Sequence, residues 1–380
     1  MIKTILFDVD GVLLSEEHYF DASALTVWEL LISKNYLALS PDTYKTDYNE
    51  EEISAIRELV FEKDQVLKFL KSRGLNANWD MIYLTFSYQL IHLLAQIKDS
   101  EFENINKWCL SPIDRNVLLE MGKVLNQYEV KVDYQLFVRD FQRFPGMKEE
   151  LFDFLNILVK EKLGVVTSIF SEKGALWSVC EHVSQEWYVG DENVVNSTGR
   201  PSVQLGKKGF LANETTLASK KEIDELFTFL VESGHTIGIG TGRPRLETVL
   251  PFRHLDWLKH FDDNRIITAD EVFQAENEHP EKKSLSKPNP FTYIMAINGK
   301  QTSVEACLNT ILPIDQGDEI LVVGDSLADL LAARQMGCQF AAVLTGLSGK
   351  DARRDFEEQQ ADYILDSVLD IKGILEPSQK

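Results

Sequence analysis

The chain has 380 residues, 44% of them hydrophobic and 26% charged, which is ordinary for a globular protein long enough for two domains. Its 39 Lys and Arg against 60 Asp and Glu give a net charge of −21, which argues against a surface for nucleic acid or an anionic membrane. No apolar stretch approaches the ~18 residues that span a bilayer, the N-terminus lacks a secretory leader, and four scattered cysteines predict reduced thiols in a cytoplasmic protein.

The first predicted element is a short buried strand at residues 2–7, which ends at Asp8-Val9-Asp10-Gly11. Asp-Gly is also a common turn pair, so a plain turn is the alternative interpretation. Two carboxylates directly after a buried strand are harder to explain as a turn alone.

Residues 20–143 have a helical character with few strand signals. Apolar side chains recur every three or four positions from Ile53 to Leu70, which predicts one face of a helix or helices. Further helices are predicted at 79–97, 116–128, 134–141 and 151–158. Residues 163–168 have the pattern of a strand. Residues 190–215 have the composition of a long loop or of a pair of poorly packed hairpins.

From about residue 218, helix and strand patterns alternate, which predicts a parallel sheet covered on both faces. The predicted strands are 236–240, 265–268, 319–323, 340–344 and 363–365, and the helices among them include 223–230, 291–297 and 327–336. The fold class is therefore α/β. Its core comprises residues 1–13 and 216–380, and a mostly helical insertion occupies 14–215. Whether residues 145–215 belong to the insertion or to the core stays open.

Ligands in open parallel sheets bind outside the carboxyl ends of the strands, so the residues that follow each predicted strand are the candidates for a site. We expect these residues to meet in one pocket if their strands are neighbours. In chain order they are Asp8, Asp10 and Gly11; Thr241, Gly242 and Arg243; Lys287, which lies in a loop; and Asp325, Ser326 and Asp329.

Three of these carboxylates, from Asp8, Asp10 and Asp325, indicate a site for a cation. Carboxylates this crowded do not all stay ionised without one. Hard oxygen ligands without His or Cys suit Mg²⁺, which binds through one or two carboxylates plus a phosphate.

The other candidates suit a phosphate group. Lys287 supplies positive charge, the Thr241 hydroxyl is a donor, and glycines at 11 and 242 let backbone N–H groups approach closely. Arg243 either binds substrate or lies on the surface. In such a site Asp8 is the nucleophile that forms an aspartyl-phosphate, and Asp10 is the general acid and base.

These segments resemble the four ordered motifs of the haloacid dehalogenase-like (HAD) hydrolase superfamily. The resemblance implies a Rossmann-like core, an aspartate nucleophile, Mg²⁺ dependence, usually phosphatase activity, and a cap formed by the insertion after the first motif. The segments that carry it are Asp8-Val9-Asp10-Gly11, Gly238-Ile239-Gly240-Thr241-Gly242-Arg243-Pro244, Lys287-Pro288, and Gly324-Asp325-Ser326 with Asp329.

Carried over to this chain, the resemblance makes Asp8 the nucleophile and a metal ligand. It makes Asp10 the acid/base, with its backbone carbonyl as a metal ligand, and Asp325 a further ligand. It implies that Thr241 and Lys287 hold the phosphate. Asp329 then supports either Asp325 or Lys287, and Ser326 is a further supporting residue.

Two features depart from the usual pattern. Dehalogenases of this superfamily lack the second aspartate of the first motif, so Asp10 disfavours dehalogenation. The insertion is also longer than a usual helical cap. A second candidate for the threonine motif exists at Val165-Val166-Thr167-Ser168, although the context of Thr241 is cleaner.

The sequence thus predicts a Mg²⁺-dependent phosphatase for a small phosphorylated metabolite. The alternatives are a phosphomutase or another phosphoryl transferase of the same fold, a phosphonatase, and a non-catalytic binding or regulatory protein. A phosphonatase needs a cap lysine positioned for a Schiff base, and no lysine of the insertion has a distinctive context. The substrate and the oligomeric state are not readable from the sequence.

Overall fold

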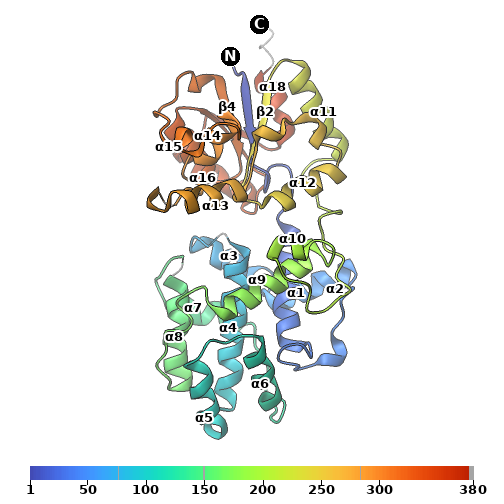
Figure 1. Cartoon of the computed structure of the whole chain (residues 1–380), viewed down its shortest axis with the longest axis vertical. Coiled ribbons are helices and arrows are strands. Elements are labelled where there is room, and N and C mark those ends of the chain that lie inside the picture. The colour runs from blue at the N-terminus through green and yellow to red at the C-terminus, as the bar shows by residue number, and fades with distance from the viewer. Residues whose placement is uncertain (76, 149, 283, 376–380) are drawn as a thin grey trace. The chain divides into compact units, whose positions relative to one another are not determined.

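Six parallel strands form one sheet, in the order β3-β2-β1-β4-β5-β6, in the part of the chain that the computed structural model describes, residues 1–75, 77–148, 150–282 and 284–375. Figure 1 shows the first strand, in blue, between β2 and β4. The strands are β1 Thr4–Phe7, β2 Thr236–Gly240, β3 Ile266–Ile267, β4 Ile320–Gly324, β5 Gln339–Val343 and β6 Tyr363–Leu365.

The strand order reverses at β1, because β2 and β3 extend the sheet on one side and β4, β5 and β6 on the other. In register, Phe7 pairs with Ile239 of β2 and with Val323 of β4. All these strands run the same way, so their carboxyl ends share one edge. A crevice outside this edge at a point of reversal is where doubly wound α/β sheets bind ligands.

Successive side chains of each strand face opposite sides of the sheet, and both sides are covered. Ile5 and Phe7 of β1 belong to one apolar cluster, with Phe227 of α11 and Trp257. Leu6 belongs to the other cluster, on the opposite face, with side chains of α14 and α16. The predicted Rossmann-like α/β fold is therefore confirmed. The helices here are α11 Lys220–Glu232, α12 Arg245–His254, α13 Ala269–Glu278, α14 Phe291–Asn298, α15 Val304–Leu308, α16 Leu327–Met336, α17 Arg353–Glu358 and α18 Ile371–Leu375.

The chain divides into two units. We call Met1–Glu17 with Leu211–Lys380 the core unit and His18–Phe210 the insertion unit. The sequence placed these boundaries at 13/14 and 215/216. Residues 145–210, whose assignment was open, lie in the insertion unit, and residues 211–215 lie in the core unit.

The insertion unit is helical throughout its regular structure in the described residues. Its central helix α4 buries nearly its whole circumference against α8 and α9, including polar side chains such as Thr85 and Gln89. The helices are α1 Glu17–Ile32, α2 Glu50–Val60, α3 Gln65–Ser72, α4 Asn78–Gln96, α5 Lys98–Cys109, α6 Arg115–Leu125, α7 Leu136–Phe141, α8 Glu150–Leu163, α9 Ala175–Val189 and α10 Val194–Thr198.

Two expectations about the insertion need correction. The predicted strand at 163–168 is wrong, because α8 continues to Leu163 and residues 164–168 form no strand. The predicted loop at 190–215 contains the short helix α10. Within the described part of the chain, none of the helices combines the length and the apolar character needed to cross a membrane.

Candidate functional site

Asp8 directly follows β1 and continues its backbone pairing with β4. Its backbone N–H donates to the carbonyl of Val323 at 2.9 Å, which fixes the direction in which its side chain points. Its Oδ1 accepts from the N–H of Val9 at 2.8 Å. Only 9% of Asp8 is exposed, so the carboxylate is held rigidly at the sheet edge.

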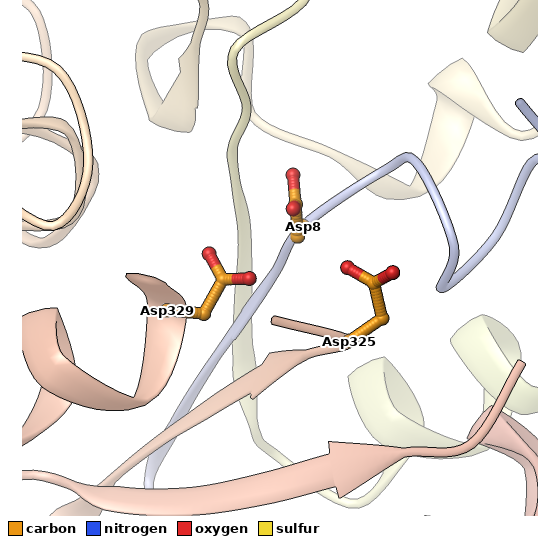
Figure 2. A group of neighbouring side chains, drawn as sticks. All are labelled: Asp8, Asp325 and Asp329. Carbon is orange, nitrogen blue, oxygen red and sulfur yellow. The ribbon is translucent and has the colours of Figure 1, made fainter. Parts of the chain in front are cut away.

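Three carboxylates gather at this edge. One oxygen each of Asp8, Asp325 and Asp329 lies within 4.8 Å of the others, and Figure 2 shows Asp8 between the two. Asp325 directly follows β4, the neighbour of β1, and Asp329 lies in the first turn of α16. Adjacent parallel strands have therefore brought together residues from both ends of the sequence, as the strand-end argument predicts.

The Asp325 carboxylate fits into a space that two glycines leave open. A Cβ at Gly11 would lie 2.1 Å from Asp325 Oδ2, and a Cβ at Gly346 would lie 1.9 Å from the same atom. Any larger residue at either position would force the carboxylate to move. Gly11 also has a positive φ of 71°, a conformation that favours glycine.

Asp329 is fully buried and bonded through both oxygens. Its Oδ1 accepts from the Tyr293 hydroxyl at 2.7 Å, and its Oδ2 accepts from the Ser326 hydroxyl at 2.6 Å. Lys287 Nζ lies 2.7 Å from Oδ1. With these donors in place, Asp329 is better suited to hold Lys287 than to bind a metal ion.

Lys287 lies between Asp329 and Asp8, with its Nζ 3.0 Å from Asp8 Oδ1 and 4.9 Å from the centre of the Tyr293 ring. Burial disfavours its charge, but the Asp329 and Asp8 carboxylates outweigh burial and raise the pKa of this ammonium above its usual range. Lys287 therefore stays charged beside the expected nucleophile.

Burial also raises the pKa of Asp8 to about 7, although Lys287 acts in the opposite direction. The nearby carboxylates of Asp329 and Asp10 also contribute to this rise. The site thus holds more negative charge than its own cations offset. Asp8 and Asp325, hard oxygen donors placed side by side, fit a divalent metal such as Mg²⁺ and would hold it.

Thr241 continues from β2, the other neighbour of β1. Its N–H donates to the Ile267 carbonyl at 3.0 Å, and its buried hydroxyl accepts from the N–H of Arg243 at 3.1 Å. Gly242 is exposed, and open space lies where its Cβ would be. Strand pairing therefore puts both residues at the same sheet edge as Asp8.

Arg243 does not lie on the surface, which was one of the two alternatives for it. It is 2% exposed, and its Nε donates to Asp10 Oδ1 at 2.7 Å. Its Nη1 donates to Glu214 Oε1 at 2.8 Å and to the carbonyl of Glu247 at 3.2 Å. The Arg243 guanidinium is buried and pairs with carboxylates, and one of these partners is Asp10.

The alternative threonine motif does not follow a strand in the structure. Thr167 belongs to the insertion unit, in a segment without strand structure, and its hydroxyl donates to the Cys109 carbonyl at 2.5 Å. It has no strand to follow, so the strand-end argument applies to Thr241 alone.

Four residues of the site were missed by sequence reasoning: Tyr293, Glu214, Thr345 and Gly346. The last two follow β5, and the Thr345 hydroxyl donates to the Gly11 carbonyl at 2.6 Å. Reading the end of that predicted strand, as was done for the others, would have found them. Tyr293 and Glu214 carry no comparable signal, because neither follows a strand.

Residues 284–371 match the protein family described as HAD-hydrolase-like. This range contains Lys287, Asp325 and Asp329 but not the first strand and its two aspartates. No curated protein matches the chain.

Among solved structures, an X-ray structure from the Northeast Structural Genomics Consortium is 38% identical, with a TM-score of 0.90, over 98% of each chain. A Haemophilus somnus structure described as a predicted phosphoglycolate phosphatase is 13% identical over 99% of this chain and 98% of that one, with a TM-score of 0.40. The CbbY protein of Rhodobacter sphaeroides in complex with phosphate is 14% identical over 98% and 96%, with a TM-score of 0.39. The last two similarities are too low to support any inference.

Proposed function

Because the chain belongs to the haloacid dehalogenase-like hydrolase superfamily, we propose that it is a Mg²⁺-dependent phosphatase of a small phosphorylated metabolite. One observation carries the proposal. The buried Asp8 carboxylate lies 3.0 Å from the Lys287 ammonium and within 4.8 Å of an Asp325 oxygen, at the point where the strand order reverses.

The reaction is a transfer of the phosphoryl group to Asp8. An Asp8 oxygen attacks phosphorus, the bond from phosphorus to the ester oxygen breaks, and Asp10 donates a proton to the leaving alcohol. Asp10 then takes a proton from water as the water attacks phosphorus, which releases inorganic phosphate and restores the Asp8 carboxylate.

The remaining residues bind and stabilise the phosphoryl group. Lys287 offsets negative charge on it, and the Thr241 hydroxyl and the backbone N–H groups near Gly11 and Gly242 donate to its oxygens. Asp8, Asp325 and the Asp10 backbone carbonyl would hold Mg²⁺, which when bound supplies further positive charge against the phosphoryl oxygens. Ser326 and Asp329 keep Lys287 in place.

The insertion unit serves in this proposal as a cap that limits access to the site, as the family resemblance implies. The cytoplasmic location expected from the scattered thiols remains a prediction. The oligomeric state stays open.

The proposal is tested by measuring phosphate release from a panel of phosphorylated metabolites and from p-nitrophenyl phosphate, with Mg²⁺ and with EDTA. We expect hydrolysis that needs Mg²⁺ and that the Asp8→Asn variant has lost. Isomerised sugar phosphate without phosphate release would identify a phosphomutase instead. Binding of phosphorylated compounds without turnover would identify a non-catalytic protein.

A further inference from the structure

Arg243 joins the expected acid/base, Asp10, to a buried carboxylate that no sequence motif includes. Its side chain is 1% exposed, as is that of Glu214, whereas that of Asp10 is 27% exposed. The two ion pairs thus connect Glu214, in the protein interior, to Asp10, which is partly exposed.

Two nitrogens of Arg243 contact the same oxygen of Asp10. Nε donates to Oδ1 at 2.7 Å, and Nη2 lies 2.7 Å from that same atom. An aspartate held at Oδ1 by a planar guanidinium has few rotamers left to it, and Oδ2 is then the oxygen that transfers protons.

Glu214 in turn is fixed by the backbone around it. It precedes a short pairing between the two connecting segments of the core unit, in which Ser15 N–H donates to the Thr215 carbonyl at 2.8 Å. Leu217 N–H donates to the Leu13 carbonyl at 3.1 Å, and Leu14 and Thr216 form a bridge. The residues that flank Glu214 are thereby tied to the segment that follows Asp10.

A buried guanidinium is costly unless carboxylates pair with it, and here Glu214 and Asp10 both do. Removing the Glu214 carboxylate would take away the partner of Nη1 on the buried side, and the guanidinium would shift toward Asp10. The orientation of Asp10 therefore depends on a residue that cannot contact substrate, since Glu214 is buried behind Arg243.

We propose that Arg243 and Glu214 are positioning residues that aim Asp10 at the leaving-group oxygen. This inference rests on the proposed phosphatase activity, in which Asp10 protonates the leaving alcohol. It gives Arg243 a role other than substrate binding, and it adds Glu214, which no sequence motif includes.

The test compares two leaving groups in Arg243→Lys and Glu214→Gln, both of which keep the size and polarity of the site. The substrates are p-nitrophenyl phosphate, whose leaving group departs without much help from an acid, and an alkyl phosphate that the wild type hydrolyses. Because kcat/KM reports the first irreversible step, we expect it to fall at least about tenfold more for the alkyl phosphate.

Two further measurements separate positioning from a structural or substrate-binding role. In an Asp10→Asn background, either substitution should cause no further loss, since the group being aimed is already absent. Competitive inhibition by inorganic phosphate should keep its inhibition constant within about threefold of wild type, because a phosphate contact to Arg243 would be worth far more.

Three results would each overturn the positioning role. The first is an equal loss of kcat/KM on the two substrates. The others are a loss that multiplies with that of Asp10→Asn and much weaker inhibition by phosphate. Failure of the underlying activity looks different, because the wild type would then hydrolyse neither substrate or would do so without Asp8. In that case the positioning role falls together with the proposed function. A Glu214→Gln variant that folds and leaves the leaving-group preference at its wild-type value overturns the inference alone.

Discussion

The ammonium of Lys287 lies 3.0 Å from Oδ1 of Asp8, so the expected nucleophile and its cation form an ion pair although they come from distant parts of the chain. The same ammonium lies 2.7 Å from Asp329, which Tyr293 and Ser326 hold in place. Lys287 therefore separates two buried carboxylates that would otherwise repel each other.

Lys287→Met should weaken both the fold and the activity. Breaking a buried ion pair leaves an uncompensated charge, and we expect the free energy of unfolding to fall by about 3–5 kcal/mol. We expect kcat to fall by about 10²-fold or more, because a group that offsets charge in the transition state is lost. Denaturant unfolding and steady-state hydrolysis check the two effects.

Lys282→Met is the matched control, since Lys282 is an exposed lysine of the short 3-10 helix Pro280–Lys282, five positions before Lys287 in the sequence. It should change neither quantity appreciably. A Lys287→Met variant that turns over like the wild type would contradict the role of Lys287.

Gly346→Ala should weaken metal binding more than it weakens the fold. The new Cβ would lie 1.9 Å from Asp325 Oδ2, so the carboxylate must leave its place beside Asp8. We expect the Mg²⁺ dissociation constant to rise by about tenfold or more, as for other losses of support around a metal ligand. Isothermal titration calorimetry with Mg²⁺ measures this constant.

Gly373→Ala serves as the control, because nothing lies within 4 Å of a Cβ built there. Its dissociation constant should match that of the wild type. Unchanged Mg²⁺ affinity in Gly346→Ala would show that Asp325 is not a ligand or that the close approach at Gly346 is harmless.

The raised pKa of Asp8 links both stability and Mg²⁺ binding to pH. In the metal-free protein this pKa rises from its ordinary 3.8 to about 7, mainly through burial. Between these values the folded chain keeps a proton that the unfolded chain has lost. The free energy of unfolding should therefore fall as the pH rises through this range, and this slope should be absent in Asp8→Asn.

Mg²⁺ must displace that proton to reach the Asp8 carboxylate. We therefore expect proton release on Mg²⁺ binding below about pH 7, and weaker Mg²⁺ affinity as the pH falls toward 5. Calorimetry in two buffers of different ionisation enthalpy counts the released protons. If Asp8 is a ligand, protonation of its carboxylate must weaken Mg²⁺ binding. A Mg²⁺ affinity that does not change between pH 5 and 8 would therefore argue against Asp8 as a ligand.

Within the insertion unit, Lys207 should contribute strongly to the free energy of unfolding, whereas its neighbour Lys208 should contribute little. The Lys207 ammonium is buried between Glu29 at 2.7 Å and Glu186, whose Oε1 accepts from the Val203 N–H at 2.9 Å. We expect Lys207→Met to lower the free energy of unfolding by about 3–5 kcal/mol, because two carboxylates remain buried without their cation.

Lys208 pairs with Asp47 on the surface, where both side chains are largely exposed. Lys208→Met should leave the stability nearly unchanged, because solvent already screens this pair. Thermal unfolding of the two variants compares neighbouring lysines in one experiment. Equal stabilities would mean that the buried cluster contributes little.

Local signals explain which parts of the fold were predictable. The sequence placed a helix at 327–336, and α16 has these bounds because Ser326 caps its first turn and Gly337 ends it in a left-handed conformation. The strand at 236–240 was likewise found where β2 lies. The segment 163–168 looks like a strand, but a strand also needs a neighbour to pair with, and a short apolar run does not show one.

The site was predictable as far as it follows from strand ends. Asp8, Thr241 and Asp325 all follow neighbouring strands, so one rule about parallel sheets brings them together. The burial of Arg243 was not predictable, because its partner Glu214 lies in a segment with no regular structure. Pairs of this kind depend on how loops pack, and a short sequence motif does not indicate loop packing.

The most direct test of the central claim is to trap the reaction and locate the phosphoryl group. Wild type mixed with p-nitrophenyl phosphate and Mg²⁺ is quenched in acid within one turnover and digested for mass spectrometry. The account predicts a phosphorylated peptide modified at Asp8, and none from Asp8→Asn. Phosphate release by wild type with no label at Asp8, or normal turnover by Asp8→Asn, would contradict it.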